Sequence, residues 1–241
     1  MKGQISRTPD IRYVMAIDTT GTPTNGPKPY GPWPPEKPII GWDLPFYIVS
    51  DTPGVVNVFN PAPEQGNIWT HMLVLSFIGG NPKYEVWQQL NPGTASRQIQ
   101  PLQDLIQGQD YSLTNSGTPA GSTITGPVTG PIDTIELRLV LQQRLGFTSA
   151  KLKELTQIEV NLVTMIRPPD SATTGNLTGW KLDQWFNQNI EYFPINLDPN
   201  AAPERRDALD ASLLYPQNKP PQVPDDDVTF KGYASEVKEQ K

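Results

Sequence analysis

The chain has 241 residues, of which 27 are proline, 19 glycine, one histidine and none cysteine. The absence of cysteine excludes disulfides and thiolate metal sites, and the prolines disfavour long helices. A formal net charge of −6 argues against binding to a phosphate backbone, which requires a basic excess. No stretch reaches the roughly 20 apolar residues of a membrane-spanning helix, and the N-terminus, MKGQISR, lacks the apolar core of a signal peptide.

In the first third of the chain, strand-like segments alternate with proline-rich loops. Residues 11–17 carry alternating side chains, which predict a strand. Residues 19–38 contain seven prolines and three glycines, so they predict an extended segment that is either a linker or an arm lying across a neighbouring surface. Further strands are expected at 39–50, 55–59, 68–77 and 84–90. The strand at 68–77 is apolar on both faces, which indicates a central strand. A Gly-Gly-Asn-Pro turn joins it to the strand at 84–90, and the two form a hairpin.

The strongest strand pattern lies further along the chain. Aliphatic residues alternate with polar ones over 135–141 and again over 158–162, which predicts two paired antiparallel strands. Their polar side chains predict a face that is wet or meets another polar surface. A turn or two of helix is expected between them, within 149–155.

The remaining segments carry weaker patterns. Residues 91–131 predict a long surface excursion, with a strand or a turn of helix at 98–105 and short strands at 111–114 and 122–125. Residues 180–193 fit a helix, although 190–197 also fit a strand. A short helix is expected over 203–214, with Asn200 near its N-cap. After Pro216 the composition predicts a tail that is flexible or ordered only against a partner.

Few residues suggest catalysis. The one histidine, His71, shares its predicted face with Trp69, Leu73 and Phe77. A Ser-His-Asp site would need a nucleophile beside it, and the G-x-S-x-G pattern is absent. We therefore interpret His71 as a core or interface histidine.

The acidic residues also lack a diagnostic pattern. Three consecutive aspartates at 225–227 do not have the alternate spacing of a calcium loop, and we interpret them as a solvated charge run. A glycosidase needs two convergent carboxylates. Candidates are Asp43, Glu85, Asp133 and Glu136, and nothing in the sequence pairs any two of them. We expect no enzymatic activity, no cofactor and no metal.

These features predict an all-β fold, an antiparallel β-sandwich with a jelly roll as the leading topology and few short helices. The predicted divisions are an N-terminal proline-rich arm with one strand (1–38), a β-sandwich core (39–199) and a short helix followed by an extended or flexible tail (200–241). In this general character the chain resembles virion structural proteins, the capsid and capsid-surface class. The resemblance covers the whole chain through its size, its proline-rich ends and its lack of cysteine, and it assigns no residue a role.

The resemblance implies a structural subunit that assembles in the host cytoplasm and resides in the virion. Its partners would be copies of itself and other particle subunits, with neither direct nucleic-acid binding nor membrane insertion. Aromatic residues in proline-rich ends would be costly to leave in water. We therefore expect the terminal aromatics at subunit interfaces: Tyr30, Trp33, Phe230 and Tyr233.

Two alternatives remain open on the sequence. One is a β-sandwich that binds a host receptor or a carbohydrate, as a viral or phage attachment protein does, through the 91–131 loops or exposed tryptophans. The six tryptophans could stack on sugars, although packing in the core or at an interface is the simpler interpretation. The other is a hydrolase built on paired carboxylates.

Overall fold

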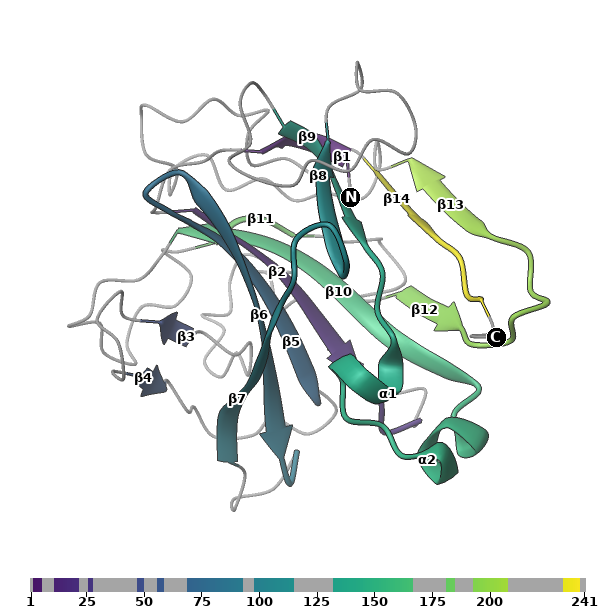
Figure 1. The fold of residues 1–241 in the computed structure, drawn as a ribbon. Helices are drawn as coiled ribbons and strands as arrows, with labels where there is room; N and C mark the ends of the chain where they lie inside the picture. The colour runs from purple at the N-terminus through teal and green to yellow at the C-terminus, as the bar shows by residue number, and fades with distance from the viewer. Residues whose placement is uncertain are drawn as a thin grey trace, which may run out of the picture.

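The computed structural model describes eleven stretches of the chain. They are residues 2–5, 11–21, 26–27, 47–49, 56–58, 69–92, 98–114, 132–166, 181–184, 193–207 and 232–238. Within them the regular structure is mostly antiparallel strand, with two short helices, α1 (Leu141–Arg144) and α2 (Ser149–Glu154) (Figure 1). The expected all-β class is therefore confirmed.

The larger sheet has seven strands in the order β11-β10-β2-β5-β6-β7, with β12 also pairing with β10. Its strands are β2 (Ile11–Asp18), β5 (His71–Ile78), β6 (Asn81–Leu90), β7 (Gln98–Leu105), β10 (Gln157–Ile166), β11 (Lys181–Gln184) and β12 (Phe193–Asn196). The predicted hairpin is confirmed: β5 and β6 are joined at Gly79 and Gly80, whose φ values of 56° and 82° suit a type I′ turn. Glycine is needed there because other residues rarely adopt two successive positive φ angles.

The second sheet has five strands in the order β13-β14-β1-β9-β8. Its strands are β1 (Lys2–Ile5), β8 (Tyr111–Thr114), β9 (Ile132–Leu137), β13 (Glu204–Asp207) and β14 (Gly232–Ser235). The two ends of the chain meet in it, because Lys2 of β1 is in register with Gly232 of β14. A separate two-stranded sheet pairs β3 (Tyr47–Val49) with β4 (Val56–Val58).

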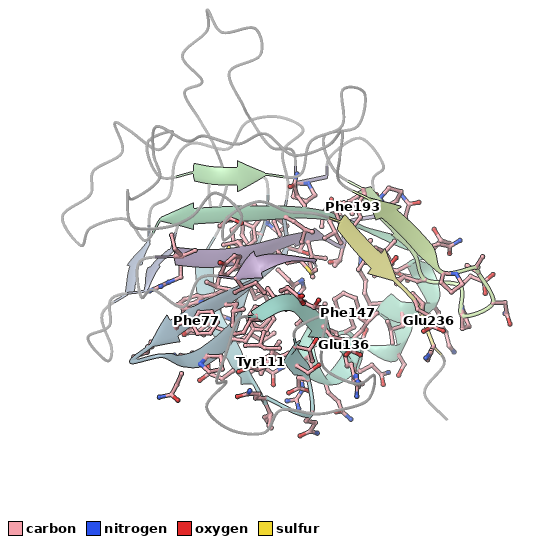
Figure 2. The ribbon with its side chains drawn as sticks, turned by 90° about the horizontal axis from the view of Figure 1, so that it is seen from above. Phe77, Tyr111, Glu136, Phe147, Phe193 and Glu236 are labelled. Atoms are coloured by element: carbon pink, nitrogen blue, oxygen red, sulfur yellow. The ribbon has the colours of Figure 1, made fainter. Side chains whose placement is uncertain are left out.

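One apolar core draws residues from both large sheets. The five-stranded sheet contributes Ile5, Leu113, Ile132 and Ile135, and the seven-stranded sheet contributes a larger set that includes Ile17, Leu73, Leu75, Phe77, Val86, Val160 and Leu162. Phe147, between α1 and α2, lies inside this cluster together with Phe77 and Phe193, while Glu236 lies at the outer margin beyond β14 (Figure 2). Each such side chain contributes about 1.5–3 kcal/mol by leaving water. This shared core holds the two sheets together.

The predicted pairing of the two alternating segments is wrong. β9 pairs with β1 and β8, whereas β10 pairs with β2, β11 and β12 in the other sheet. β9 also ends at Leu137, and Leu141, expected in a strand, begins α1. The expected helix between the segments is α2, with the Thr148 hydroxyl accepting a hydrogen bond from the Lys151 amide as its N-cap. The helices carry the chain between sheets, so they are not part of a hairpin.

The expectations for the C-terminal residues also change. Residues 204–207, expected in a helix, form β13, because their backbone pairs with β14. The predicted tail supplies β14, so Gly232–Ser235 is ordered within its own chain. Residues 180–197, which fit either a helix or a strand, are strand where they are described, in β11 and β12. Residues 98–105 form the strand β7. Residues 122–125 lie outside the described residues, and the three divisions of the chain stay a prediction.

A buried ion pair joins elements of the two sheets. Arg144 of α1 donates from Nε to Asp110 Oδ1 over 2.7 Å, and its Nη1 lies 3.2 Å from Gln103 Oε1 on β7. Asp110 also accepts from the Ile106 amide over 2.7 Å, and it directly precedes β8. The side chains of Arg144 and Asp110 are only 13% and 4% exposed, so the ion pair is shielded from water.

Replacing Asp110 with alanine should lower the free energy of unfolding by about 3 kcal/mol, because the Arg144 guanidinium would stay buried without its counter-charge. Denaturant titration followed by circular dichroism measures this loss. Glu236→Ala serves as the control, since its ion pair with Lys238 (2.9 Å) is exposed and contributes little. Equal effects of the two substitutions would contradict the structural role assigned to Arg144 and Asp110.

Candidate functional site: buried polar residues of the seven-stranded sheet

Polar side chains gather on the face of the seven-stranded sheet that points away from the core. Side chains alternate along a strand, and residues in register share a face. Ile17 and Val160 belong to the core, so Asp18 and Glu159, which are in register, lie on the opposite face. Apolar residues of this second face are buried outside the core cluster: Val14, Ala16, Met72, Val74 and Trp87. The sheet is therefore covered on both sides.

The polar residues of this second face are buried as well. They include Arg12, Asp18, Ser76, Glu85, Gln89, Glu159 and Asn161. Of the two predicted alternatives, the polar face of β10 is not wet, because Glu159 and Asn161 are 0% and 1% exposed, and it meets other polar residues. The polar face of β9 is wet, since Glu136 is exposed. Asn161 donates from Nδ2 to the carbonyl of Pro27 over 2.9 Å. The proline-rich segment thus contacts its own sheet at Pro27.

Asp18 and Glu159 form a buried carboxyl pair, and both side chains are 0% exposed. The two oxygens of Asp18 accept hydrogen bonds from the amide and the hydroxyl of Thr20, each over 2.8 Å. Glu159 accepts at Oε1 from Gln157 over 2.8 Å, and its Oε2 has no hydrogen-bond partner. Burial raises the pKa of Asp18 to about 6, the negative charge of Glu159 adds to this, and the Thr20 hydrogen bonds oppose it.

A cluster of hydroxyl groups lies beside this pair. The Thr70 hydroxyl is within hydrogen-bonding distance of the Thr19 amide (3.1 Å), the Thr19 hydroxyl (2.9 Å), the Ile17 carbonyl (3.2 Å) and Nδ1 of His71 (3.0 Å). These contacts join the end of β2 to the start of β5. They also connect the polar second face to His71, whose side chain points to the core.

The structure places His71 as the sequence predicts, among apolar residues. Its ring meets Phe147 edge-on, with centroids 5.6 Å apart. Burial lowers the pKa of His71 to about 4, and the Leu145 backbone offsets this only in part. Nε2 has no partner with hydrogen-bonding geometry. Thr70 is the only hydroxyl that the described structure shows bonded to the ring, and Asp18 lies on the other face, so these residues do not assemble a Ser-His-Asp site.

The carboxylates named from the sequence are not brought together in the described structure. Glu85 is bound by Lys83 over 2.7 Å on β6, and Glu136 by Arg138 over 2.9 Å on β9, in the other sheet. Asp133 shares β9 with Glu136, but a three-residue spacing puts the two side chains on opposite faces. Asp43 and the aspartates at 225–227 lie outside the described residues, within which no three His, Cys, Asp or Glu side chains could hold a metal.

The expected interface residues are mostly outside the described part of the chain. Tyr30, Trp33 and Phe230 fall there, and for Tyr233 only the backbone is described, paired with Arg206 between β14 and β13. The buried pair of Asp18 and Glu159 was missed by the sequence analysis. The available signal was weak: each is an acidic residue beside β-branched or aliphatic residues, and the two lie far apart in the sequence.

Comparison with protein-family models, with curated proteins and with solved structures finds no match to this chain. Among the residues that the structure describes, neither helix has the length and apolar composition needed to cross a membrane. Inferences about function therefore depend on the fold and on the residues themselves.

Thr70→Val should lower the free energy of unfolding by about 1–3 kcal/mol, because valine keeps the shape but leaves the Thr19 amide and His71 Nδ1 without their partner. Denaturant titration at pH 7 gives the value. Thr134→Val is the matched control, because that half-buried hydroxyl bonds only to the neighbouring Asp133 over 2.8 Å and should cost less. A loss no larger than that of the control would show that Thr70 does not join β2 to β5.

Proposed function

We propose that this chain is a structural subunit of a virus particle, with its two large sheets stacked as a β-sandwich. The observation that carries the proposal is the single apolar core to which both sheets contribute. The chain passes between the sheets four times, from β1 to β2, β7 to β8, β9 to β10 and β12 to β13. Repeated crossing of this kind supports a jelly-roll arrangement of the sandwich, which is common in capsid proteins.

The contacts of the charged residues support a role in assembly and not in catalysis. The ion-paired carboxylates of the described residues contact Lys83, Arg138, Arg144 or Lys238, and the buried pair of Asp110 and Arg144 links elements of the two sheets. His71 is buried against Phe147 and neutral over most of the pH range. Side chains arranged in this way serve to build a stable subunit.

The partners in this proposal are copies of the chain and other particle subunits. Tyr30, Trp33, Phe230 and Tyr233 would supply the contacts, because buried aromatic side chains contribute most to protein interfaces. Their segments flank residues that the structure ties to the sheets, at Pro27 and in β14. A contact made by these segments would therefore act directly on a rigid sheet.

The test must keep both ends of the chain. Removing residues 1–38 would delete β1 and β2, which pair with β9 and β14 and with β5 and β10, so it would test folding and not assembly. Substitutions in the full chain avoid this problem.

We expect the full chain to sediment as a large particle, and the triple variant Tyr30→Ala, Trp33→Ala, Phe230→Ala to sediment as smaller species with an unchanged far-ultraviolet circular dichroism spectrum. Ile106→Ala is the control, since that side chain is 52% exposed in the turn before β8 and lies outside the proposed contacts. Analytical ultracentrifugation over a range of concentrations measures the species. A full chain that stays monomeric at all concentrations would contradict the proposal.

A further inference from the structure

Within the described residues, the buried carboxyl pair of Asp18 and Glu159 has no cationic partner. The two residues are in register on adjacent central strands, so their Cβ atoms are about 5 Å apart. Hydrogen bonds from Thr20 and Gln157 satisfy three of the four oxygens, and Oε2 of Glu159 has no partner. Two carboxylates this close and both fully buried cannot stay ionised together without a large cost.

Among the described residues, the neighbouring strands supply no counter-charge. The residue that faces Asp18 is Thr70, just before β5; Gln89 of β6 lies beyond it, and Pro194 of β12 is opposite Glu159. The charged residues on the same face of the sheet lie farther along it: Arg12 is six residues from Asp18, roughly 20 Å along β2, and Glu85 is held by Lys83. None of the ion pairs in the described structure includes Asp18 or Glu159.

A second buried titratable group lies across the sheet from the pair. His71 points to the core and packs on Phe147, and its Nδ1 is 3.0 Å from the Thr70 hydroxyl. Thr70 in turn contacts Thr19, the residue after Asp18, at 2.9 Å. Protonating His71 would place a cation in an apolar core, whereas protonating Asp18 would remove one of two adjacent buried negative charges.

We propose that Asp18, buried beside Glu159, binds a proton in mild acid and that this uptake offsets the loss of stability caused by protonating His71. Asp18 and His71 are buried on opposite faces of one sheet, and their protonation changes the stability of the folded state in opposite directions. The inference concerns the folded subunit and goes beyond the proposed role in a particle, on which it does not depend.

The directions of the pKa shifts of Asp18 and His71 are those expected from their burial. The pKa of Asp18 is raised from 3.8 to about 6, so the folded state gains stability as the pH falls through that interval. The pKa of His71 is lowered from 6.5 to about 4, so the folded state loses stability as the pH falls from 6.5 to 4. Each shift corresponds to a change of roughly 100-fold or more in the folding equilibrium constant, and the two intervals overlap almost completely.

The test measures the unfolding equilibrium constant by denaturant titration between pH 4 and pH 7.5 in the wild type, Asp18→Asn, His71→Gln and the double variant. Relative to the wild type, Asp18→Asn should lose stability on acidification by roughly 100-fold, because the His71 penalty is then unopposed. His71→Gln should gain stability over the same interval by a similar factor. The double variant should match the wild type in its pH dependence. Glu136→Gln, at an exposed carboxylate, is the control for removing an acid.

Single variants whose pH dependence matches that of the wild type would overturn the proposal. If Asp18→Asn does not fold, carbon-13 NMR titration of the wild-type carboxyl groups decides: a proton bound by Asp18 above pH 5 supports the proposal, and its absence overturns it. Adding Ca²⁺ at pH 7 tests the alternative that Asp18 and Glu159 form a metal site. Stabilisation by Ca²⁺ that requires Asp18 would show that the pair binds a cation in place of a proton, which also overturns the proposal.

Discussion

The structure depends on the burial of both faces of the seven-stranded sheet. One face packs on the five-stranded sheet through the shared apolar core, and the other is buried along β2, β5, β6 and β10. A strand in this position has no solvent side on which to place polar residues. Every polar side chain that β2 or β10 carries on the second face must therefore find a partner inside the protein or remain buried at a cost.

That constraint accounts for the polar contacts of the second face. Thr70 bonds to groups on Thr19, Ile17 and His71, and Asn161 reaches the Pro27 carbonyl. Both oxygens of Asp18 accept hydrogen bonds from Thr20. Glu159 is satisfied only in part, and it lies beside another carboxyl group. Buried polar contacts of this kind favour one register of β2 against β10, because a shift by one residue would move Asp18 and Glu159 into the apolar core.

Much of the local structure could be predicted, and the long-range pairing could not. Alternation identified β2 and β10, and the Gly79-Gly80 turn identified the β5–β6 hairpin, because each signal is contained in a few neighbouring residues. The same alternation wrongly paired residues 135–141 with 158–162. Residues 158–162 lie wholly in β10 and 135–137 lie in β9, but α1, α2 and Gly146 (φ 67°) take the chain from one sheet to the other between them. The helix expected after Pro203 was wrong for a similar reason, since pairing of β13 with β14 outweighs local preference.

By itself the sequence determined the all-β class, the central position of β5 and the placing of His71 among apolar residues, since each follows from composition or from neighbours in the chain. Only the tertiary structure decided which strands pair, that the polar residues of β10 are buried, and that Asp18 meets Glu159. A strand pattern states that one face is apolar, but it carries no information on what covers the other face. The physical reason is that backbone pairing is nearly independent of side-chain identity, so distant strands are selected by the packing of the whole core.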